Sequence, residues 1–331
     1  MKQIVLVLFL LPLVGAVGNA PARPAAKAET LRLESSVVAM GSAYSVVVYG
    51  EDRTRMEGAV DAAFDEVHRL DQMLSNYKPE SELSEINREA GEHPVAVTKE
   101  LFDLLAACVE YSRASKGAFD ITVGPLMKVW GFYKGTGRLP HRAEVLGALD
   151  RVGYRNIILD STQRTVRFAK QGVELDPGGI GKGYAVDRMV DALKQYGIQS
   201  ALVSASGSSI YGLGAPPGEK GWKVQIRDPK NEKKSVAEIY LKDESMSTSG
   251  NYEKFFRAEG RIYSHIMDPR TGWPAQGVLS VSAITPRTID SEAWTKPLFV
   301  NGRAWAAKHR PAGLRAFFCE DSPEQTCAWL Q

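Results

Sequence analysis

The chain has 331 residues, of which 44% are hydrophobic and 24% are charged, and its formal net charge is +2. These values are typical of a soluble globular protein of one or two domains. They give no support to broad electrostatic binding of nucleic acid, although a local site for an anion such as phosphate is compatible with them.

The N-terminus has a pattern of its own. Lys2 is followed by an apolar run up to Val17 and by small residues up to Ala20. This pattern is typical of a signal peptide, and the run is too short to span a bilayer comfortably. We therefore expect a signal peptide over 1–20, a linker over 21–35 and export to the periplasm. The alternative is an uncleaved leader that keeps the protein at the membrane.

The body of the chain mixes the two kinds of periodicity. Helical spacing of apolar residues, with capping residues at several starts, predicts helices over 56–74, 81–90, 98–115, 142–149, 179–196, 291–300 and 305–309. Alternation or short apolar runs predict strands over 36–49 with a break at 40–42, and over 157–159, 166–168, 173–175, 201–204, 222–227, 237–241, 263–266, 280–284 and 315–318. This order predicts an α+β fold of mixed α/β layers. No repeat or low-complexity stretch interrupts it, so we expect one compact domain over 36–331.

The cysteines fit a protein of an oxidising compartment. Cys319 and Cys327 flank an Asp-Ser-Pro turn and form either a local disulfide or two free thiols. Cys108 lies in an apolar helical stretch, which places it in the core. The five histidines are scattered and lack the spacing of zinc ligands.

A cluster of four glycines lies between Asp176 and Asp187, where a predicted strand meets a helix. Glycines let the backbone approach a ligand, and a helix N-terminus offers free amides to an anion. Lys182 adds a positive charge there. The segment matches neither the Walker loop nor the dinucleotide-binding fingerprint. Its alternative interpretation is a tight turn with a solvated lysine.

Two later segments carry hydroxyl and imidazole groups. Residues 247–252 place Thr248 and Ser249 beside a glycine, an arrangement that suits a phosphate or ribose but also an ordinary turn. Residues 264–272 bring His265 near an aspartate and an arginine. His265 is a candidate proton shuttle, and the alternative is a turn held by the acid–base pair.

A last segment, 290–296, places Glu292 and Lys296 four residues apart on a predicted helix. Such a pair is either a helix salt bridge or, for the glutamate, a carboxylate ligand of magnesium.

Taken in order, these segments resemble the ApbE family of FAD:protein FMN transferases. The resemblance extends over roughly 37–302 and includes Met40-Gly41-Ser42, the motif-rich stretch 76–87 and the run Gly-Ala-Phe-Asp-Ile-Thr over 117–122. It implies a single ApbE-like, T-fold-related catalytic domain. It also implies an enzyme that binds FAD with Mg²⁺, attaches FMN to a threonine or serine of a target flavoprotein and releases AMP.

The same resemblance assigns roles to residues. The nucleotide would contact residues of both halves of the chain, namely Met40, Tyr77, Asp120, Gly179, Lys182, Asp187, Thr248 and Ser249. His265 and Lys182 would act in catalysis. The implied partners are flavoprotein subunits of membrane redox complexes, or exported reductases, and no nucleic acid.

Two departures from the family pattern concern this site. The family's metal-binding aspartate falls on Glu292 and its threonine on Lys296, whose ammonium group has only donors. A shift by one residue places Thr295 on the ligand face, so the expected metal ligands are Gly181, Glu292 and Thr295. The second departure is Ser206-Gly-Ser-Ser, where the family has Gly-Gly-Asp after an asparagine. Two alternatives follow, a non-catalytic FAD-binding protein with a degenerate metal site and an FAD pyrophosphatase.

Overall fold

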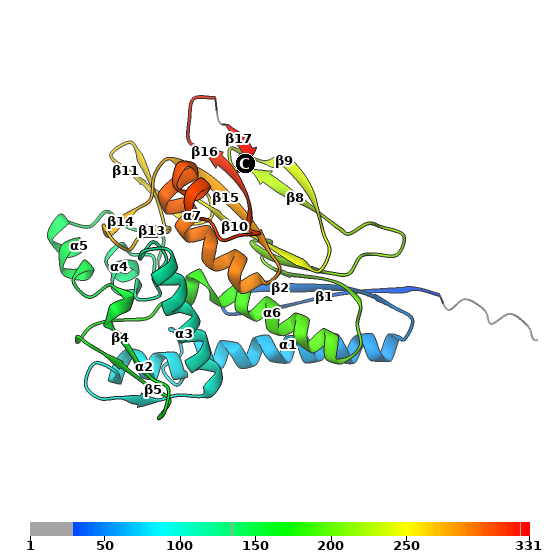
Figure 1. Cartoon of the computed structure of the whole chain (residues 1–331), viewed down its shortest axis with the longest axis horizontal. Helices are drawn as coiled ribbons and strands as arrows, with labels where there is room; N and C mark the ends of the chain where they lie inside the picture. The colour runs from blue at the N-terminus through cyan, green and yellow to red at the C-terminus, as the bar shows by residue number, and fades with distance from the viewer. Residues whose placement is uncertain (1–28, 134, 325) are drawn as a thin grey trace, which may run out of the picture.

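The computed structural model describes residues 29–133, 135–324 and 326–331, and its centre is an eight-stranded antiparallel sheet (Figure 1). In spatial order the strands are β1 (Leu31–Ala39), β2 (Ser42–Gly50), β6 (Ser200–Ala205), β7 (Ser209–Leu213), β10 (Glu244–Gly250), β15 (Val278–Thr285), β16 (Arg315–Glu320) and β17 (Cys327–Trp329). The predicted signal peptide and residues 21–28 of the predicted linker lie outside the described residues.

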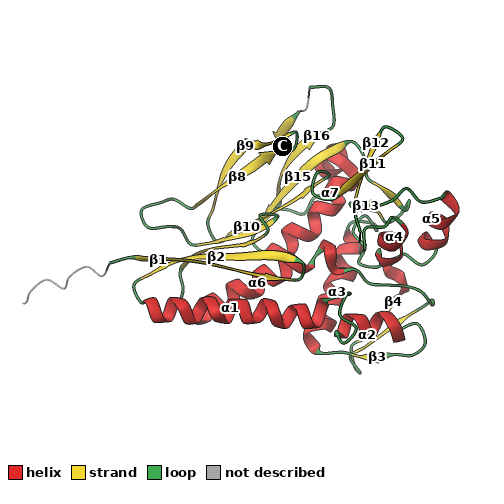
Figure 2. Ribbon diagram, turned by 180° about the vertical axis from the view of Figure 1, so that it is seen from behind, coloured by secondary structure: helices red, strands yellow, loops and turns green. Residues whose placement is uncertain are grey.

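Helices and a hairpin cover the two faces of this sheet. On one face pack α1 (Arg53–Leu74), α6 (Gly181–Gln195) and α7 (Thr288–His309), as the two opposite views show (Figures 1 and 2). The hairpin of β8 (Trp222–Asp228) and β9 (Asn231–Leu241) covers the other face. The division follows strand alternation: in β16, Phe318 packs with α7 and Phe317 with the hairpin.

Smaller elements surround one end of this layered body. They are α2 (Glu82–Glu89), α3 (Lys99–Ala114), α4 (Gly124–Val129), α5 (Arg142–Leu149), the sheet of β3 (Val95–Ala96), β5 (Thr165–Phe168) and β4 (Ile157–Asp160), and the pairs β11 (Phe255–Ala258) with β12 (Arg261–Ser264) and β13 (Met267–Asp268) with β14 (Trp273–Pro274). The α+β fold of mixed layers in a single domain is therefore confirmed.

Most predicted elements are present, and three differ. Strand β1 begins at Leu31, inside the predicted linker, because residues 31–38 alternate between half-buried and exposed positions and pair with β2. The strand expected over 173–175 is absent, since only Glu174 forms an isolated bridge, with Val123. Helix α7 bends at Gly302, whose φ of 75° and ψ of −179° separate the two predicted helices.

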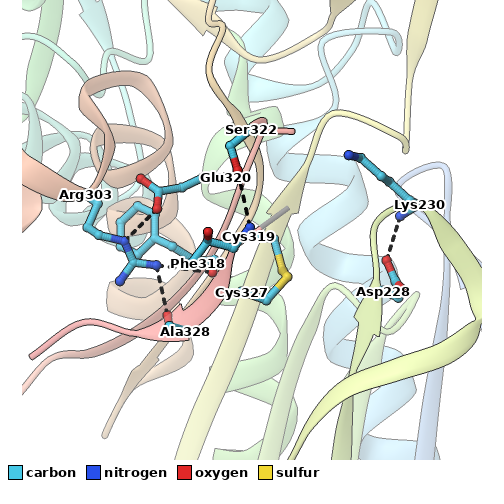
Figure 3. The surroundings of a disulfide bond; sticks show 10 residues. Asp228, Lys230, Arg303, Phe318, Cys319, Glu320, Ser322, Cys327 and Ala328 are labelled. Carbon is cyan, nitrogen blue, oxygen red and sulfur yellow. Dashed lines mark hydrogen bonds and ion pairs between the residues drawn. A yellow bond between two sulfur atoms is a disulfide. The ribbon is translucent and has the colours of Figure 1, made fainter. Parts of the chain in front are cut away.

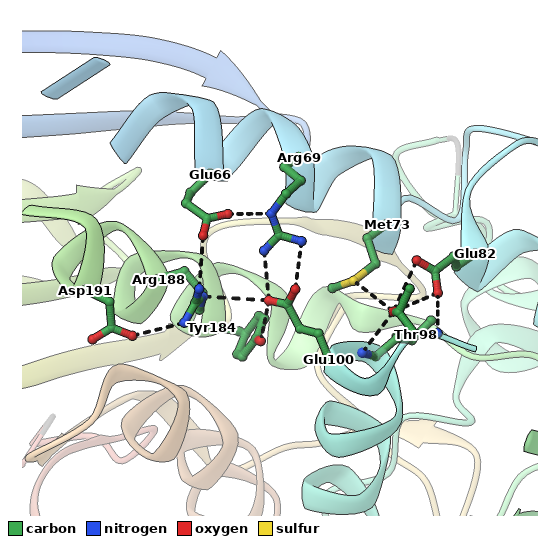
Figure 4. Close-up of polar contacts among 10 residues, drawn as sticks. Glu66, Arg69, Met73, Glu82, Thr98, Glu100, Tyr184, Arg188 and Asp191 are labelled. Atoms are coloured by element: carbon green, nitrogen blue, oxygen red, sulfur yellow. Dashed lines mark hydrogen bonds and ion pairs between the residues drawn. The ribbon is translucent and has the colours of Figure 1, made fainter. Parts of the chain in front are cut away.

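An acid–base network joins α1, α3 and α6 (Figure 4). Glu100 at the start of α3 accepts hydrogen bonds from Arg69 of α1, at 2.9 Å, and from the Tyr184 hydroxyl of α6, at 2.7 Å. Arg188 of α6 donates to Glu66 of α1, at 3.0 Å. These contacts fix the direction of α6, whose first turn carries the glycine cluster.

A disulfide between Cys319 and Cys327 joins β16 to β17 (Figure 3). Arg303 supports the same edge of the sheet, since it donates to Glu320 and to the carbonyl groups of Ala328 and Trp329. The bonded state resolves the two alternatives left by the sequence. Cys108 is buried, as expected. None of the described helices is both long and apolar enough to cross a membrane.

We expect reduction of this disulfide to lower the stability of the fold. The two cysteines are 8 residues apart, and closing so short a loop contributes about 2–3 kcal/mol by the chain-entropy account. Dithiothreitol should therefore lower the melting temperature of the wild type by several degrees. The Cys327→Ser variant should melt at the lower temperature with or without the reagent. An unchanged wild-type melting temperature in the reduced state would contradict this assignment.

Candidate functional site

The glycine cluster forms the entry into α6. A 3₁₀ turn at Pro177–Gly179 leads into the helix, and Ile180 at the N-cap position provides no side-chain cap. Asp176 caps the 3₁₀ turn instead, accepting from the Gly178 amide at 2.8 Å. The first turn of α6 thus receives no side-chain cap from its own N-cap residue, and a helix N-terminus of this kind favours an anionic ligand.

Gly183 holds α6 and α7 in close contact. Its amide donates to Oε2 of Glu292, which is 2% exposed. A Cβ at position 183 would lie 2.5 Å from the carbonyl oxygen of Thr288 and 2.9 Å from Cβ of Glu292. The absence of a side chain is therefore required here by the neighbouring helix.

Two other segments of the fold cover the cluster. Met40, in the β1–β2 turn, has a φ of 51°, and its methyl carbon would be 3.3 Å from a Cβ on Gly181. Lys296 of α7 lies across Gly179, where its Cε would be 3.5 Å from an added Cβ. Met40 from the first turn of the sheet and Lys296 from the last long helix thus both contact this loop.

Lysines lie around the glycine cluster at the start of α6. Nζ of Lys182 donates to the Ser208 hydroxyl in the β6–β7 turn, at 2.6 Å. The pKa of Lys296 is lowered to about 8, because burial disfavours its charge and Lys182 lies close by, which outweighs the opposing effect of Glu292. A site that crowds ammonium groups in this way favours a ligand with negative charge.

His265 lies within the electrostatic range of these lysines. The carbonyl of Lys254 accepts from the His265 ring at Nδ1, at 3.1 Å, and from its backbone amide, at 3.0 Å. The proton is therefore on Nδ1, and Nε2 is left as an acceptor. Burial first, and then the charges of Lys254, Lys182 and Lys296, lower the pKa of His265 to about 4. The imidazole is neutral at pH 7, which is the form that can accept a proton.

Two predicted nucleotide-binding carboxylates have partners inside the protein. Asp187 accepts from the backbone amides of Thr288 and Ile289, at 2.7 and 2.9 Å, and so caps α7. Asp120 accepts from Thr122 and from the Tyr154 amide. Burial raises the pKa of both carboxyl groups. In this structure their hydrogen bonds position α7 and the loop after α3.

A cavity of about 330 Å³ lies beside the glycine cluster. Its lining includes Asn76, Tyr77, Lys128 and Tyr133. Tyr77 stacks on Tyr133 with ring centres 4.8 Å apart and is 52% exposed. A cavity of this size, with a stacked aromatic pair of which Tyr77 is exposed and with a few polar groups, suits a planar heteroaromatic ring.

Sequence reasoning assigned no role to two residues that the fold brings to this region, Asp176 and Lys254. Asp176 joins the cavity to the cluster, since it also accepts from the amide nitrogen of Asn76, at 3.3 Å. Lys254 supplies the carbonyl that orients His265. The position of Asp176 directly before the glycines could have been used to find it, whereas the position of Lys254 carries no local signal.

The comparisons with known proteins agree with this geometry. A sequence profile described as "ApbE family" matches residues 40–318. The chain belongs to the ApbE family.

Members of the ApbE family with curated names are similar over most of their length. A protein of Treponema pallidum named FAD:protein FMN transferase is 34% identical over 282 residues, covering 80% of this chain and 77% of its own. One of Klebsiella pneumoniae with the same name is 32% identical over 289 residues, covering 86% and 87%. The crystal structure of the ApbE protein from Thermotoga maritima superposes with a TM-score of 0.82 at 30% identity, covering 90% of this chain and 96% of that one.

The hydroxyls of this ApbE-family chain that the sequence places near the nucleotide lie on β10. Adjacent residues of a strand point to opposite faces. Ser249 donates to the Thr295 hydroxyl of α7, at 2.8 Å, and Thr248 shares a hydrogen bond with Ser282 of β15, at 2.7 Å. Of the two, Ser249 therefore faces α7.

The expected metal ligands of this ApbE-family chain do not fit Mg²⁺ as they are arranged. Oε2 of Glu292 accepts from Gly183, and Oε1 lies 3.7 Å from Nζ of Lys296. The Thr295 hydroxyl donates to the Glu292 carbonyl, at 2.7 Å, and accepts from Ser249. Gly181 begins α6, so its carbonyl belongs to the helix. Magnesium needs several oxygen ligands at about 2.1 Å in octahedral geometry. An ammonium group instead lies beside the carboxylate, and no described group of three or more His, Cys, Asp or Glu could hold a metal ion.

Proposed function

We propose that this chain is an FAD:protein FMN transferase, which attaches the FMN half of FAD to a threonine or serine hydroxyl of another protein and releases AMP. The observation that carries the proposal is the arrangement of Lys182, Lys296 and neutral His265 around the N-terminus of α6 in a chain of the ApbE family. Two curated relatives of that name are similar over more than three quarters of their length.

The glycine cluster and the cavity bind different parts of FAD. The FAD pyrophosphate lies at the first turn of α6, where Lys182 and Lys296 balance its charge. The flavin ring occupies the cavity beside Tyr77. These contacts hold the phosphorus of the FMN half in reach of an acceptor hydroxyl, so that catalysis rests on position and electrostatics.

In the transfer step, the acceptor oxygen forms a bond with that phosphorus. The bond from the same phosphorus to the bridging oxygen breaks, and AMP leaves with this oxygen. Nε2 of His265 accepts the proton of the hydroxyl, and the Nδ1 hydrogen bond to Lys254 keeps the ring in the tautomer needed for this. No step is assigned to magnesium, because the residues beside Glu292 do not fit it.

The proposed place of action is outside the cytoplasm. The leader over 1–20 has the pattern of a signal peptide, and the Cys319–Cys327 disulfide fits an oxidising compartment. The acceptors that such an enzyme meets are exported flavoproteins, namely subunits of membrane redox complexes or exported reductases.

An acceptor assay tests the proposal. The purified chain is incubated with FAD and a recombinant flavoprotein domain of a membrane redox complex that carries a surface threonine. Flavin fluorescence that stays on the acceptor in a denaturing gel, with release of AMP, is expected. An acceptor whose threonine is replaced by valine serves as the matched control and should show no flavin fluorescence in the gel.

Two other outcomes would replace the proposal. Free FMN and AMP without labelled acceptor would show a pyrophosphatase. FAD that is retained but unchanged would show a binding protein without transferase activity.

A further inference from the structure

Lys296 has an unusual environment for a lysine of a long helix. Its side chain is 22% exposed, although it extends from α7 toward the centre of the site. Nζ donates to the carbonyl of Glu292, at 3.1 Å, and lies 3.7 Å from a carboxylate oxygen of the same residue. Because an ammonium group has three donors, this leaves donors of Lys296 for a ligand in the exposed direction.

Neighbouring residues hold the ammonium group of Lys296 at the glycine cluster. The methylene chain of Lys296 passes over Gly179, where its Cε and Cδ would lie 3.5 and 4.0 Å from an added Cβ. Glu292 cannot turn away, because it is buried and bonded to the Gly183 amide. The cation is therefore fixed between α7 and the start of α6, in the position where two helices and the 3₁₀ turn converge.

The charges around this point match a pyrophosphate without a further cation. Lys182 and Lys296 carry two positive charges, and the pyrophosphate of FAD carries two negative ones. Lys254 adds a third positive charge close to His265. Glu292 offsets part of this total and accepts from the Gly183 amide, while the first turn of α6, which has no side-chain cap from Ile180, adds partial positive charge.

We propose that the ammonium group of Lys296 takes the place of a divalent metal ion against the pyrophosphate of FAD, so that this chain binds and uses FAD without magnesium. This inference rests on the proposed function of the site. It assigns to a side chain of α7 the electrostatic role for which the resemblance implied Mg²⁺.

The first test compares FAD affinity in EDTA and in excess MgCl₂, measured by quenching of flavin fluorescence with the full chain. For the wild type we expect dissociation constants that agree within about twofold. For Lys296→Thr and Lys296→Met we expect FAD binding in EDTA to be weaker by about 10–100-fold, the loss associated with a charged hydrogen bond. Lys308→Thr removes a lysine from the exposed end of the same helix and should leave the affinity unchanged.

A second measurement observes the metal directly. Electron paramagnetic resonance of Mn²⁺ added with FAD should show no bound ion in the wild type. Lys296→Thr, which introduces an oxygen ligand, should gain a bound Mn²⁺ if the ammonium group had excluded it. Circular dichroism verifies that each variant is folded.

The outcomes separate this inference from the proposed function. Wild-type FAD binding that falls at least tenfold in EDTA and returns with MgCl₂ would overturn the role of Lys296, and so would full affinity in both Lys296 variants. Absence of FAD binding under every condition would overturn the proposed function instead. Metal-independent FAD binding without labelled acceptor would support the role of Lys296 in FAD binding and refute the transferase.

Discussion

His265→Ala is expected to lower the rate constant of FMN transfer by about 10²–10⁴-fold, the range associated with loss of a general base. The affinity for FAD should change little, because the imidazole is assigned to the acceptor hydroxyl and not to the nucleotide. The measurement is the initial rate of acceptor labelling at saturating FAD, with the dissociation constant of FAD taken in parallel. His68→Ala, on the exposed side of α1, is the matched control and should keep full activity. An undiminished rate in His265→Ala would remove the residue from the mechanism.

The pKa of His265 gives this prediction a pH dependence. Burial and three lysines lower that pKa to about 4, so the free enzyme keeps the neutral base from pH 8 down to about pH 5. Protonation below this range removes the acceptor, and kcat/KM should fall there. The bound pyrophosphate partly neutralises the lysines, so the corresponding fall in kcat should lie at higher pH. A fall in kcat/KM centred near pH 6.5, the ordinary value for histidine, would contradict the environment described.

Gly183→Ala is expected to destabilise the protein and to abolish most of its FAD binding. The added methyl carbon would lie 2.5 Å from the Thr288 carbonyl oxygen, which is backbone and cannot move alone. Removing this clash requires α6 and α7 to separate, which weakens the Gly183–Glu292 hydrogen bond. The overpacking costs about 1–3 kcal/mol. The same movement displaces Lys296 from the glycine turn.

Thermal unfolding and FAD titration of the variant provide the measurements. A melting temperature lower by several degrees is expected, together with weaker FAD binding. Gly147→Ala in α5 is the matched control, since an added Cβ there meets nothing within 4 Å and alanine favours a helix over glycine. Equal melting temperatures for wild type and Gly183→Ala would show that the two helices pack less tightly than described.

Local signals in the sequence were sufficient for most of the fold. Ser81 and Thr98 predicted the starts of α2 and α3, and in the structure each accepts a hydrogen bond from an amide of the following turn. Gly197, with a φ of 76°, ends α6 where the sequence expects it to end. Caps and closing glycines act over a few residues, so they can be identified without knowledge of the tertiary structure.

Strand β10 shows why other parts could not be predicted. Its inward-facing residues are serines, which carry no apolar signal. Ser247 and Ser249 are buried because they bond to Ser291 and Thr295 of α7, more than forty positions away. The contact between Lys254 and His265 likewise depends on the path of the β11–β12 hairpin. The glycine cluster and its lysine were recognisable as a site, whereas the partners of each side chain depended on how α7 packs on the sheet.

Strand β1 separates the described start of the chain from the candidate site. Its 9 residues run from the described start of the chain to the turn that carries Met40, a rise of about 30 Å. The described start of the chain and the glycine cluster, which Met40 contacts, therefore lie at opposite ends of one extended strand. Whatever is attached before β1 thus joins the fold about 30 Å from the cluster, and an acceptor protein can approach the Met40 turn without meeting that attachment point.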